Sequence, residues 1–194
     1  MRILLAKRRA LGDTVFLSGT ISALAQVEAS LEIHVLVPRA FASLLEGHPH
    51  IRSIFQYDTG RFRLLRDVRA LRFDHFVQLH SSPSQHWLAR LSGARQVHFS
   101  VQNNETEKAY GKHPSALEWD GFFLRRIFGE RLSVPVPEPK IYLSEQEREE
   151  GVRIWRSLGV DPGRVVFLGL GASRPTKRWP TQHFARLEIG RAHV

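Results

Sequence analysis

The chain has 194 residues, 42% hydrophobic and 24% charged, a composition typical of globular domains rather than of disordered or fibrous chains. Its formal net charge of +9 favours anionic partners such as nucleotides, phosphorylated lipids or nucleic acid. It has no cysteine, which excludes disulfides and Cys-ligated zinc and fits a cytoplasmic location. No apolar run approaches the roughly 20 residues of a spanning helix, and the start lacks the apolar core of a secretory signal.

Strands and helices are predicted to alternate over the first hundred residues. The expected strands are 2–6, 32–37, 52–57, 73–79 and 96–101, and the expected helices are 14–28, 39–46, 61–71 and 84–91. This alternation predicts an α/β fold with parallel strands and helices on both faces. Ligands of such Rossmann-like sheets bind beyond the carboxyl ends of the strands.

The second half of the chain is predicted to begin with a polar loop over 102–114 and helices over 116–128 and 144–158. Ser144 and Glu147 have the spacing of a capping box at the start of the second helix. A turn cluster at 159–163 then predicts a domain boundary, followed by a strand over 165–170 and a helix from about Trp179.

Arginines are frequent between the predicted strands, with few acids among them. Two interpretations stay open: solvated helix faces, or a basic face toward a membrane or a substrate. No basic recognition helix, aromatic platform or zinc-finger pattern appears, so nucleic acid is not an expected partner. The arginines concerned are Arg61, Arg63, Arg66, Arg69, Arg72, Arg90, Arg95, Arg125, Arg126 and Arg131.

The first motif with chemical potential is Ala10-Leu-Gly-Asp-Thr14, at the turn between the first strand and the first helix. Gly12 would allow close backbone approach, and Asp13 would stand at the carboxyl edge of the sheet. The alternative is that Asp13 or Thr14 only caps the helix, since both residue types are good N-caps.

The second motif is Gly171-Ala-Ser-Arg-Pro-Thr-Lys-Arg-Trp-Pro180, which follows the apolar run 165–170. The hydroxyls of Ser173 and Thr176 and the amine of Lys177 could bind phosphate oxygens at the start of the next helix. The alternative is a proline-shaped loop with a solvated lysine. A Walker loop is excluded, because its Gly-x-x-x-x-Gly-Lys-Ser/Thr pattern is absent.

The ten histidines include no HExxH pattern and no tight His/Cys set, so no metal site is expected. His80 and Ser81 follow the fourth predicted strand at the ligand edge. They could touch an acceptor molecule, or His80 could stabilise a turn. No Gly-x-Ser-x-Gly elbow supports a serine hydrolase.

Several segments together resemble glycosyltransferase family 9, the ADP-heptose lipopolysaccharide heptosyltransferases. They are Arg2-Ile-Leu-Leu with Ala10-Leu-Gly-Asp-Thr14, Ala42-Ser-Leu-Leu-Glu-Gly-His-Pro-His50, Leu88-Ala-Arg-Leu-Ser-Gly-Ala-Arg95 and Gly171 to Pro180. The resemblance implies the GT-B architecture, two Rossmann-like domains around a cleft. It places a complete acceptor-binding domain at 1–160 and only the start of a nucleotide-sugar-binding domain at 161–188.

The resemblance also implies roles for individual residues. Asp13 looks like the catalytic base that takes the proton of an acceptor hydroxyl. Lys177, with Ser173 and Thr176, looks like the group that binds the donor diphosphate and stabilises the departing ADP without a metal or other cofactor. Lower-ranked acceptor contacts are Gly12, Thr14, His80 and Ser81.

The implied reaction is inverting transfer of a heptose from ADP-heptose to a phosphorylated glycolipid, the inner core of lipopolysaccharide, at the cytoplasmic face of the inner membrane. Two alternatives are a nucleotide-sugar-binding module without transfer activity and a family member with a different donor. Because most of the second domain's contacts lie beyond this segment, the chain alone is expected to be inactive.

The last six residues, Ile189-Gly-Arg-Ala-His-Val194, match one reading frame of a common sequencing adapter, so 189–194 is expected to be a non-native tail. Residues from about 162 onward are expected to pack poorly, because one strand and part of a helix cannot bury their apolar faces. Val165, Val166, Phe167 and Leu168 are then expected to be exposed and to favour aggregation.

Overall fold

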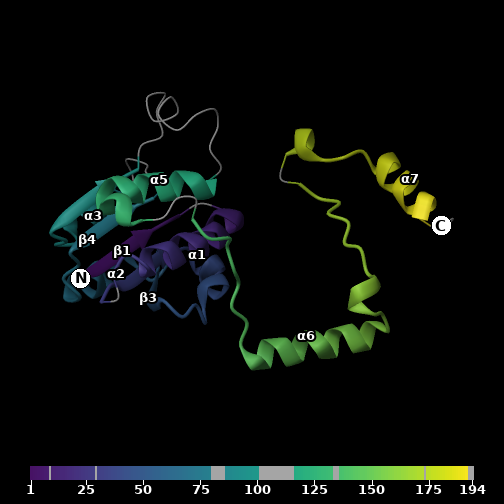
Figure 1. The fold of residues 1–194 in the computed structure, drawn as a ribbon, viewed down its shortest axis with the longest axis horizontal. Coiled ribbons are helices and arrows are strands. Elements are labelled where there is room, and N and C mark those ends of the chain that lie inside the picture. Colours follow the sequence, from purple (N-terminus) through teal and green to yellow (C-terminus); the bar gives the residue numbers. More distant parts are fainter. Residues whose placement is uncertain are drawn as a thin grey trace. The chain divides into compact units, whose positions relative to one another are not determined.

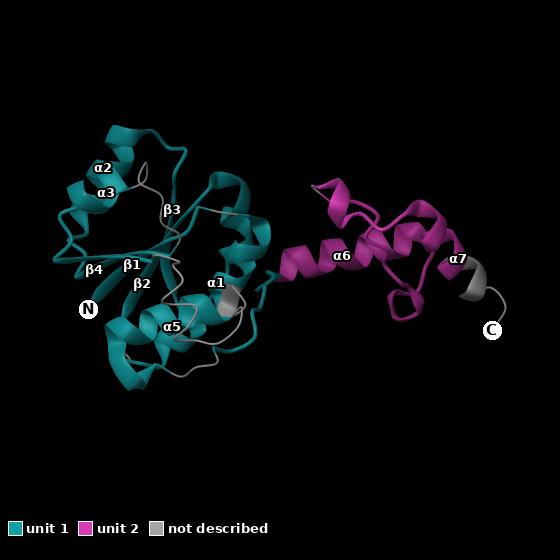
Figure 2. Cartoon of the chain, turned by 90° about the horizontal axis from the view of Figure 1, so that it is seen from above, with its two compact units in different colours: residues 1–144 teal, residues 145–194 magenta. Residues whose placement is uncertain are grey.

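The computed structural model describes residues 1–8, 10–28, 30–79, 86–100, 116–132, 136–172 and 174–191 (Figure 1). It divides into two compact units, Met1–Ser144 and Glu145–Val194, coloured separately in Figure 2. The predicted loop at 102–114 lies outside the described residues. The assignment of residues 1–160 and 161–188 to two domains stays a prediction.

Unit 1 is built on a parallel sheet, as the βα alternation predicts. Its five strands have the order β3-β2-β1-β4-β5. Every neighbouring pair of strands is parallel. The strands are β1 Arg2–Ala6, β2 Glu32–Val37, β3 Ile51–Gln56, β4 His75–Gln78 and β5 Gln96–Phe99. Because β1 is central, its apolar residues are buried on both faces, as in other parallel sheets.

Helices cover both faces of this sheet. On one face α1 and α5 pack over Ile3 and Leu5 of β1. On the other face α2 and α3 pack over Leu4 and Ala6. Figure 2 shows the two pairs of helices on opposite sides of the sheet. The bounds are α1 Leu11–Ala25, the 3-10 helix η1 Arg39–Leu45, α2 Arg61–Ala70, α3 His86–Leu91, α5 Ala116–Phe128 and the 3-10 helix η3 Gly129–Arg131.

The first helix starts earlier than its apolar spacing predicts. It begins at Leu11 rather than at Thr14, with Ala10 at the N-cap and no side-chain cap. Gly12, Asp13 and Thr14 therefore lie in the first turn of α1, inside the helix. The interpretation of Asp13 or Thr14 as the N-cap is wrong, because three residues of the motif extend the helix toward the sheet.

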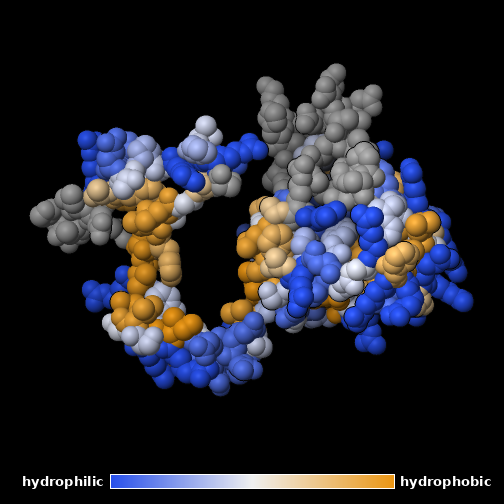
Figure 3. Space-filling view, turned by 180° about the vertical axis from the view of Figure 1, so that it is seen from behind, coloured by the Kyte–Doolittle hydropathy of each residue, from blue (hydrophilic) through white to orange (hydrophobic). Residues whose placement is uncertain are grey.

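Unit 2 contains the predicted helices but not the predicted strand. Its elements are α6 Glu145–Leu158, the 3-10 helices η4 Pro162–Arg164 and η5 Pro175–Lys177, and α7 Thr181–Arg191. Residues 165–170 form no strand, because no described strand lies beside them to accept the ladder hydrogen bonds. Val166, Phe167 and Leu168 are exposed, as expected, and Phe167 is 80% exposed, whereas Val165 is half-buried. Figure 3 shows the resulting apolar surface along this segment.

Candidate functional site

The carboxyl edge of the sheet carries a connected set of polar residues. Lys7 follows β1, and its amide donates to the carbonyl of Leu36 on β2 at 2.9 Å. Tyr57 follows β3, and Nε2 of Gln78 on β4 lies 3.5 Å from its hydroxyl. Burial raises the pKa of Tyr57 to about 12. The guanidinium of Arg8 lies 5.4 Å from the centre of the Tyr57 ring. Polar groups from three strands thus meet where ligands of α/β sheets bind.

Asp13 stands at this same edge. It lies in the first turn of α1, directly after the β1 connection, and its side chain is half-buried. The partial positive charge of a helix N-terminus stabilises a carboxylate in this position. Asp13 is therefore an ionisable group that is accessible and fixed by regular structure.

A buried ion pair lies beside Asp13. Nζ of Lys7 contacts Oδ2 of Asp120 on α5, and only 3% and 6% of the two side-chain surfaces are exposed. Burial raises the pKa of Asp120 to about 6; the Lys7 cation opposes this shift, and the charge of Asp13 adds to it. Asp13 and Asp120 are therefore close enough for their charges to interact.

Gly12 and Thr14, the two neighbours of Asp13 in the sequence, differ in whether a ligand could reach them. A Cβ added at Gly12 would meet nothing within 4 Å, so the space in front of this position is open. Thr14 is fully buried, and its hydroxyl donates to the carbonyl of Ala10 at 3.3 Å. Gly12 faces open space, whereas the hydroxyl of Thr14 stabilises the start of α1.

Three of the predicted site residues, His80, Ser81 and Ser173, lie outside the described residues. Thr176 and Lys177 are described and belong to unit 2, whereas Asp13 belongs to unit 1. Both unit 2 residues are exposed in the 3-10 helix η5. Their predicted roles stay predictions.

The segment around Lys177 is held by hydrogen bonds within itself and is rich in cationic side chains. Nε of Arg178 donates to the carbonyl of Ala172 at 2.9 Å, and the amide of Lys177 donates to the carbonyl of Arg174 at 3.0 Å. Trp179 stacks on His183 of α7 with ring centres 5.4 Å apart. The sequence from 165 to 187 has four basic residues and no Asp or Glu. An anion there would meet cations without competing carboxylates.

Helix α2 presents a basic outer face. Leu64 and Val68 are buried against the sheet, whereas Phe62 is 92% exposed on the opposite side of the helix. Arg66 and Arg69 follow Phe62 by four and seven residues, so the three share one face. Because α2 follows β3, its first turn lies toward the same carboxyl edge as Asp13.

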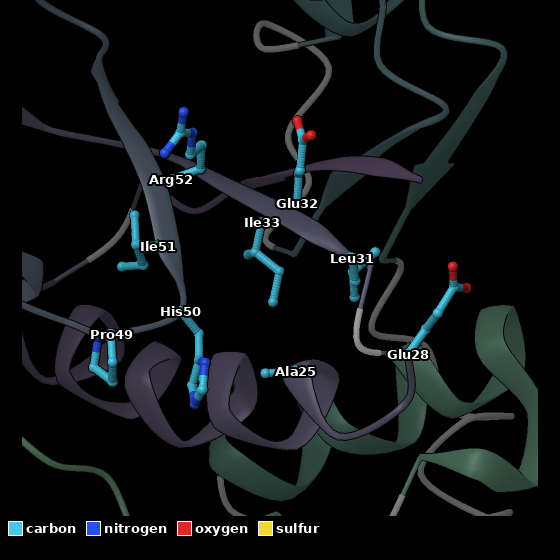
Figure 4. A pocket seen from close by; sticks show the side chains of 9 residues that line it. All are labelled: Ala25, Glu28, Leu31, Glu32, Ile33, Pro49, His50, Ile51 and Arg52. Carbon is cyan, nitrogen blue, oxygen red and sulfur yellow. The ribbon is translucent and has the colours of Figure 1, made fainter.

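A pocket of about 270 Å³ opens at the other edge of the sheet (Figure 4). Ala25 lies on α1 twelve residues after Asp13, roughly 18 Å along the helix axis. The pocket is therefore at the amino ends of the strands and separate from the polar set around Asp13. Its lining consists of Ala25, Glu28, Leu31, Glu32, Ile33, Pro49, His50, Ile51 and Arg52.

Histidines of the sheet pair with each other or with other side chains. Nδ1 of His75 lies 3.1 Å from Nε2 of His98, with the rings stacked. Burial lowers the pKa of both imidazoles. Within the described residues, no group of three His, Cys, Asp or Glu is arranged to hold a metal ion. Nor does that part of the chain contain a helix both long and apolar enough to cross a membrane.

Sequence reasoning missed Lys7, Asp120, Tyr57 and Gln78. The position of Lys7 directly after the first strand was an available signal. No signal in the sequence pointed to Asp120, because it lies 113 residues from Lys7 and is one polar residue within an amphipathic helix.

No family model matches the chain, and no curated protein matches it. Solved structures do. A glycosyl transferase of family 9 from Veillonella parvula matches 100% of this chain and 61% of its own, with a TM-score of 0.81 and 18% identity. ADP-heptose LPS heptosyltransferase II of E. coli matches 100% of this chain and 62% of its own, with a TM-score of 0.75 and 20% identity.

A third solved structure, E. coli heptosyltransferase WaaC with ADP, matches 96% of this chain and 62% of its own, with a TM-score of 0.60 and 14% identity. The chain thus spans 61% to 62% of the length of these three structures. The sequence-based resemblance and the GT-B fold class are confirmed: the chain has the fold of the family 9 glycosyltransferase structures over its whole length.

Proposed function

We propose that this chain is the acceptor-binding domain, and the beginning of the donor-binding domain, of a glycosyltransferase. The observation that carries the proposal is a half-buried carboxylate, Asp13, at the carboxyl edge of the parallel sheet. The chain that contains this sheet matches family 9 structures over its whole length. The proposed donor is ADP-heptose, and the proposed acceptor is a phosphorylated inner-core glycolipid of lipopolysaccharide. The domains are assigned to 1–160 and 161–188.

In the proposed reaction, Asp13 accepts the proton of an acceptor hydroxyl while that oxygen attacks the anomeric carbon of the donor. The bond from this carbon to the diphosphate breaks at the same time, so the configuration is inverted and ADP leaves. Lys177, Thr176 and Ser173 are proposed to bind the diphosphate. Cations and hydroxyls there would stabilise the charge that develops on ADP, so the transfer needs no metal.

Peripheral contact with the inner membrane is also proposed, through the outer face of α2. Arg63 and Arg66 follow the exposed Phe62 on this helix; their side chains are 71% and 74% exposed, and both pair with Asp67. Arginines attract anionic headgroups, and an aromatic ring among them can enter the interfacial layer. A lipid-linked acceptor would then reach the edge where Asp13 lies.

Acceptor-dependent release of ADP by the complete protein tests the proposed function. We expect release with ADP-heptose and a heptose-deficient inner-core glycolipid, and loss of about 100-fold or more in kcat for Asp13→Asn, since a general base contributes on the order of 10² to 10⁴. ADP should bind to this variant with unchanged affinity.

ADP-sugar binding without acceptor-dependent release would favour a binding module instead. Release with ADP-glucose but not ADP-heptose would favour a different donor. The 194-residue chain alone is expected to give no release.

A further inference from the structure

The buried pair of Lys7 and Asp120 is not explained by core stability. Removing two charges from water costs several kcal/mol per ion, and well-packed apolar residues often replace such pairs without loss. Leu124, one turn along α5, is fully buried and belongs to the apolar cluster that packs on α1. An apolar pair would therefore suit this location equally well if packing were the only requirement.

The pair is held in place from both sides. The backbone of Lys7 is hydrogen-bonded to β2, so Nζ can move only by rotating its own side chain. Asp120 is 4% exposed, on a helix anchored by Leu124. Among the described residues, the charges of both Lys7 and Asp13 act on Asp120: Lys7 lowers its pKa and Asp13 raises it. This described set contains one cation and two carboxylates, and the cation is bonded to the carboxylate that is more deeply buried.

Accepting the proposed role of Asp13 as base, we propose that Asp120 is a positioning residue that retains the Lys7 cation and so leaves the carboxylate of Asp13 available to the acceptor. Without Asp120, the attraction of Lys7 would fall on Asp13. A carboxylate engaged by an ammonium group is a weaker base, because proton uptake must break the ion pair.

Three variants of the complete protein separate this role from a structural one: Asp120→Asn, Lys7→Met and the double variant. We expect Asp120→Asn to lower kcat about 10-fold to 100-fold and to move the acid limb of the kcat/KM profile to lower pH. The double variant has no buried cation left, so its kcat should recover to within about fivefold of the wild type. ADP affinity should stay unchanged in all three variants.

Glu130→Gln provides the matched control. Glu130 pairs with Arg125 of α5 at an exposed position, so its loss changes the net charge equally without altering the buried pair. The wild-type acid limb should persist in this control.

An unchanged acid limb in Asp120→Asn, with Asp13→Asn inactive, would overturn the inference and leave Asp120 a structural residue. Full turnover by Asp13→Asn would instead refute the proposed role of Asp13 as base, independently of the results for Lys7 and Asp120. If Asp120→Asn does not fold, Lys7→Met decides the matter. Without Lys7, burial raises the pKa of Asp120 further, so this carboxyl should be neutral and Asp13 should have no cation to engage it. The kcat of Lys7→Met should therefore stay within about fivefold of the wild type, and a loss of about 10-fold or more would overturn the inference, because Lys7 itself would then be required.

Discussion

Nε2 of His48 lies 3.1 Å from the carbonyl oxygen of Ser18, and the hydroxyl of Ser18 accepts a hydrogen bond from the amide of Lys140 at 2.9 Å. The His48 ring also contacts Tyr142 edge-on, with ring centres 4.7 Å apart. Since a carbonyl can only accept, Nε2 carries the proton, while Nδ1 accepts the amide of His50 at 3.3 Å. A neutral imidazole therefore joins α1 to the last residues of unit 1.

His48→Gln should reduce stability more at neutral than at acid pH. Burial lowers the pKa of His48, so the unfolded chain binds more protons here than the folded chain does. The stabilisation is present above about pH 6.5 and is lost as the pH falls. Urea denaturation of the 194-residue chain should show a loss of about 1 to 2 kcal/mol at pH 7.5, and a smaller loss at pH 5.5.

The raised pKa of Asp120 makes the free energy of unfolding fall as the pH rises, which is opposite to the effect of His48. Because wild type and His48→Gln both contain Asp120, the difference between them at each pH does not include this contribution. A gap between the two proteins that is equal at both pH values would contradict the assignment of a neutral buried imidazole.

Gly47→Ala should destabilise the chain more than Gly93→Ala. Both glycines have a positive φ, 76° and 74°, so both substitutions carry the left-handed strain of about 1 kcal/mol or more. At Gly47 an added Cβ would also lie 3.1 Å from the carbonyl oxygen of Tyr142, whereas at Gly93 it would meet nothing within 4 Å. Thermal unfolding of the two variants isolates this contact, and equal shifts in Tm would show that Tyr142 moves away without cost.

The sequence predicts unit 1 well because each strand carries its own signal. The strand β1 is mostly a run of apolar residues, and β2 ends directly before Pro38, so both strands can be recognised without distant context. The run at 165–170 has the same local character, yet it forms no strand, since pairing needs a neighbour that periodicity cannot reveal. The site divides in the same way: the motif around Asp13 was visible locally, whereas Asp120 comes to Lys7 only through the packing of α5 on the sheet.

Phe62→Ser and Arg63→Gln/Arg66→Gln should weaken binding to vesicles that contain anionic phosphatidylglycerol. Each arginine near such a surface contributes about 1 kcal/mol, so the double change should cost about 30-fold in affinity. Loss of the 92% exposed ring should cost about 10-fold. Cosedimentation with vesicles measures both, and neutral phosphatidylcholine vesicles should bind none of the proteins.

The matched control for the vesicle experiment is Arg153→Gln/Arg156→Gln on α6, which removes the same charge from exposed positions of unit 2. An equal loss of binding in this control would mean that the total charge, rather than the face of α2, attracts the membrane.

Gly12→Ala should stabilise the chain while impairing the proposed transfer. Gly12 lies in the first turn of α1, its φ is not in the left-handed region, and an added Cβ meets no atom within 4 Å. Alanine should therefore raise the free energy of unfolding by about 0.5 kcal/mol through the lower entropy of the unfolded chain. If a sugar approaches the backbone at this point, the same methyl group should raise the KM for the acceptor several-fold. Unfolding curves and acceptor titrations measure the two effects separately, and a stabilised variant with an unchanged KM would place the acceptor elsewhere along the carboxyl edge.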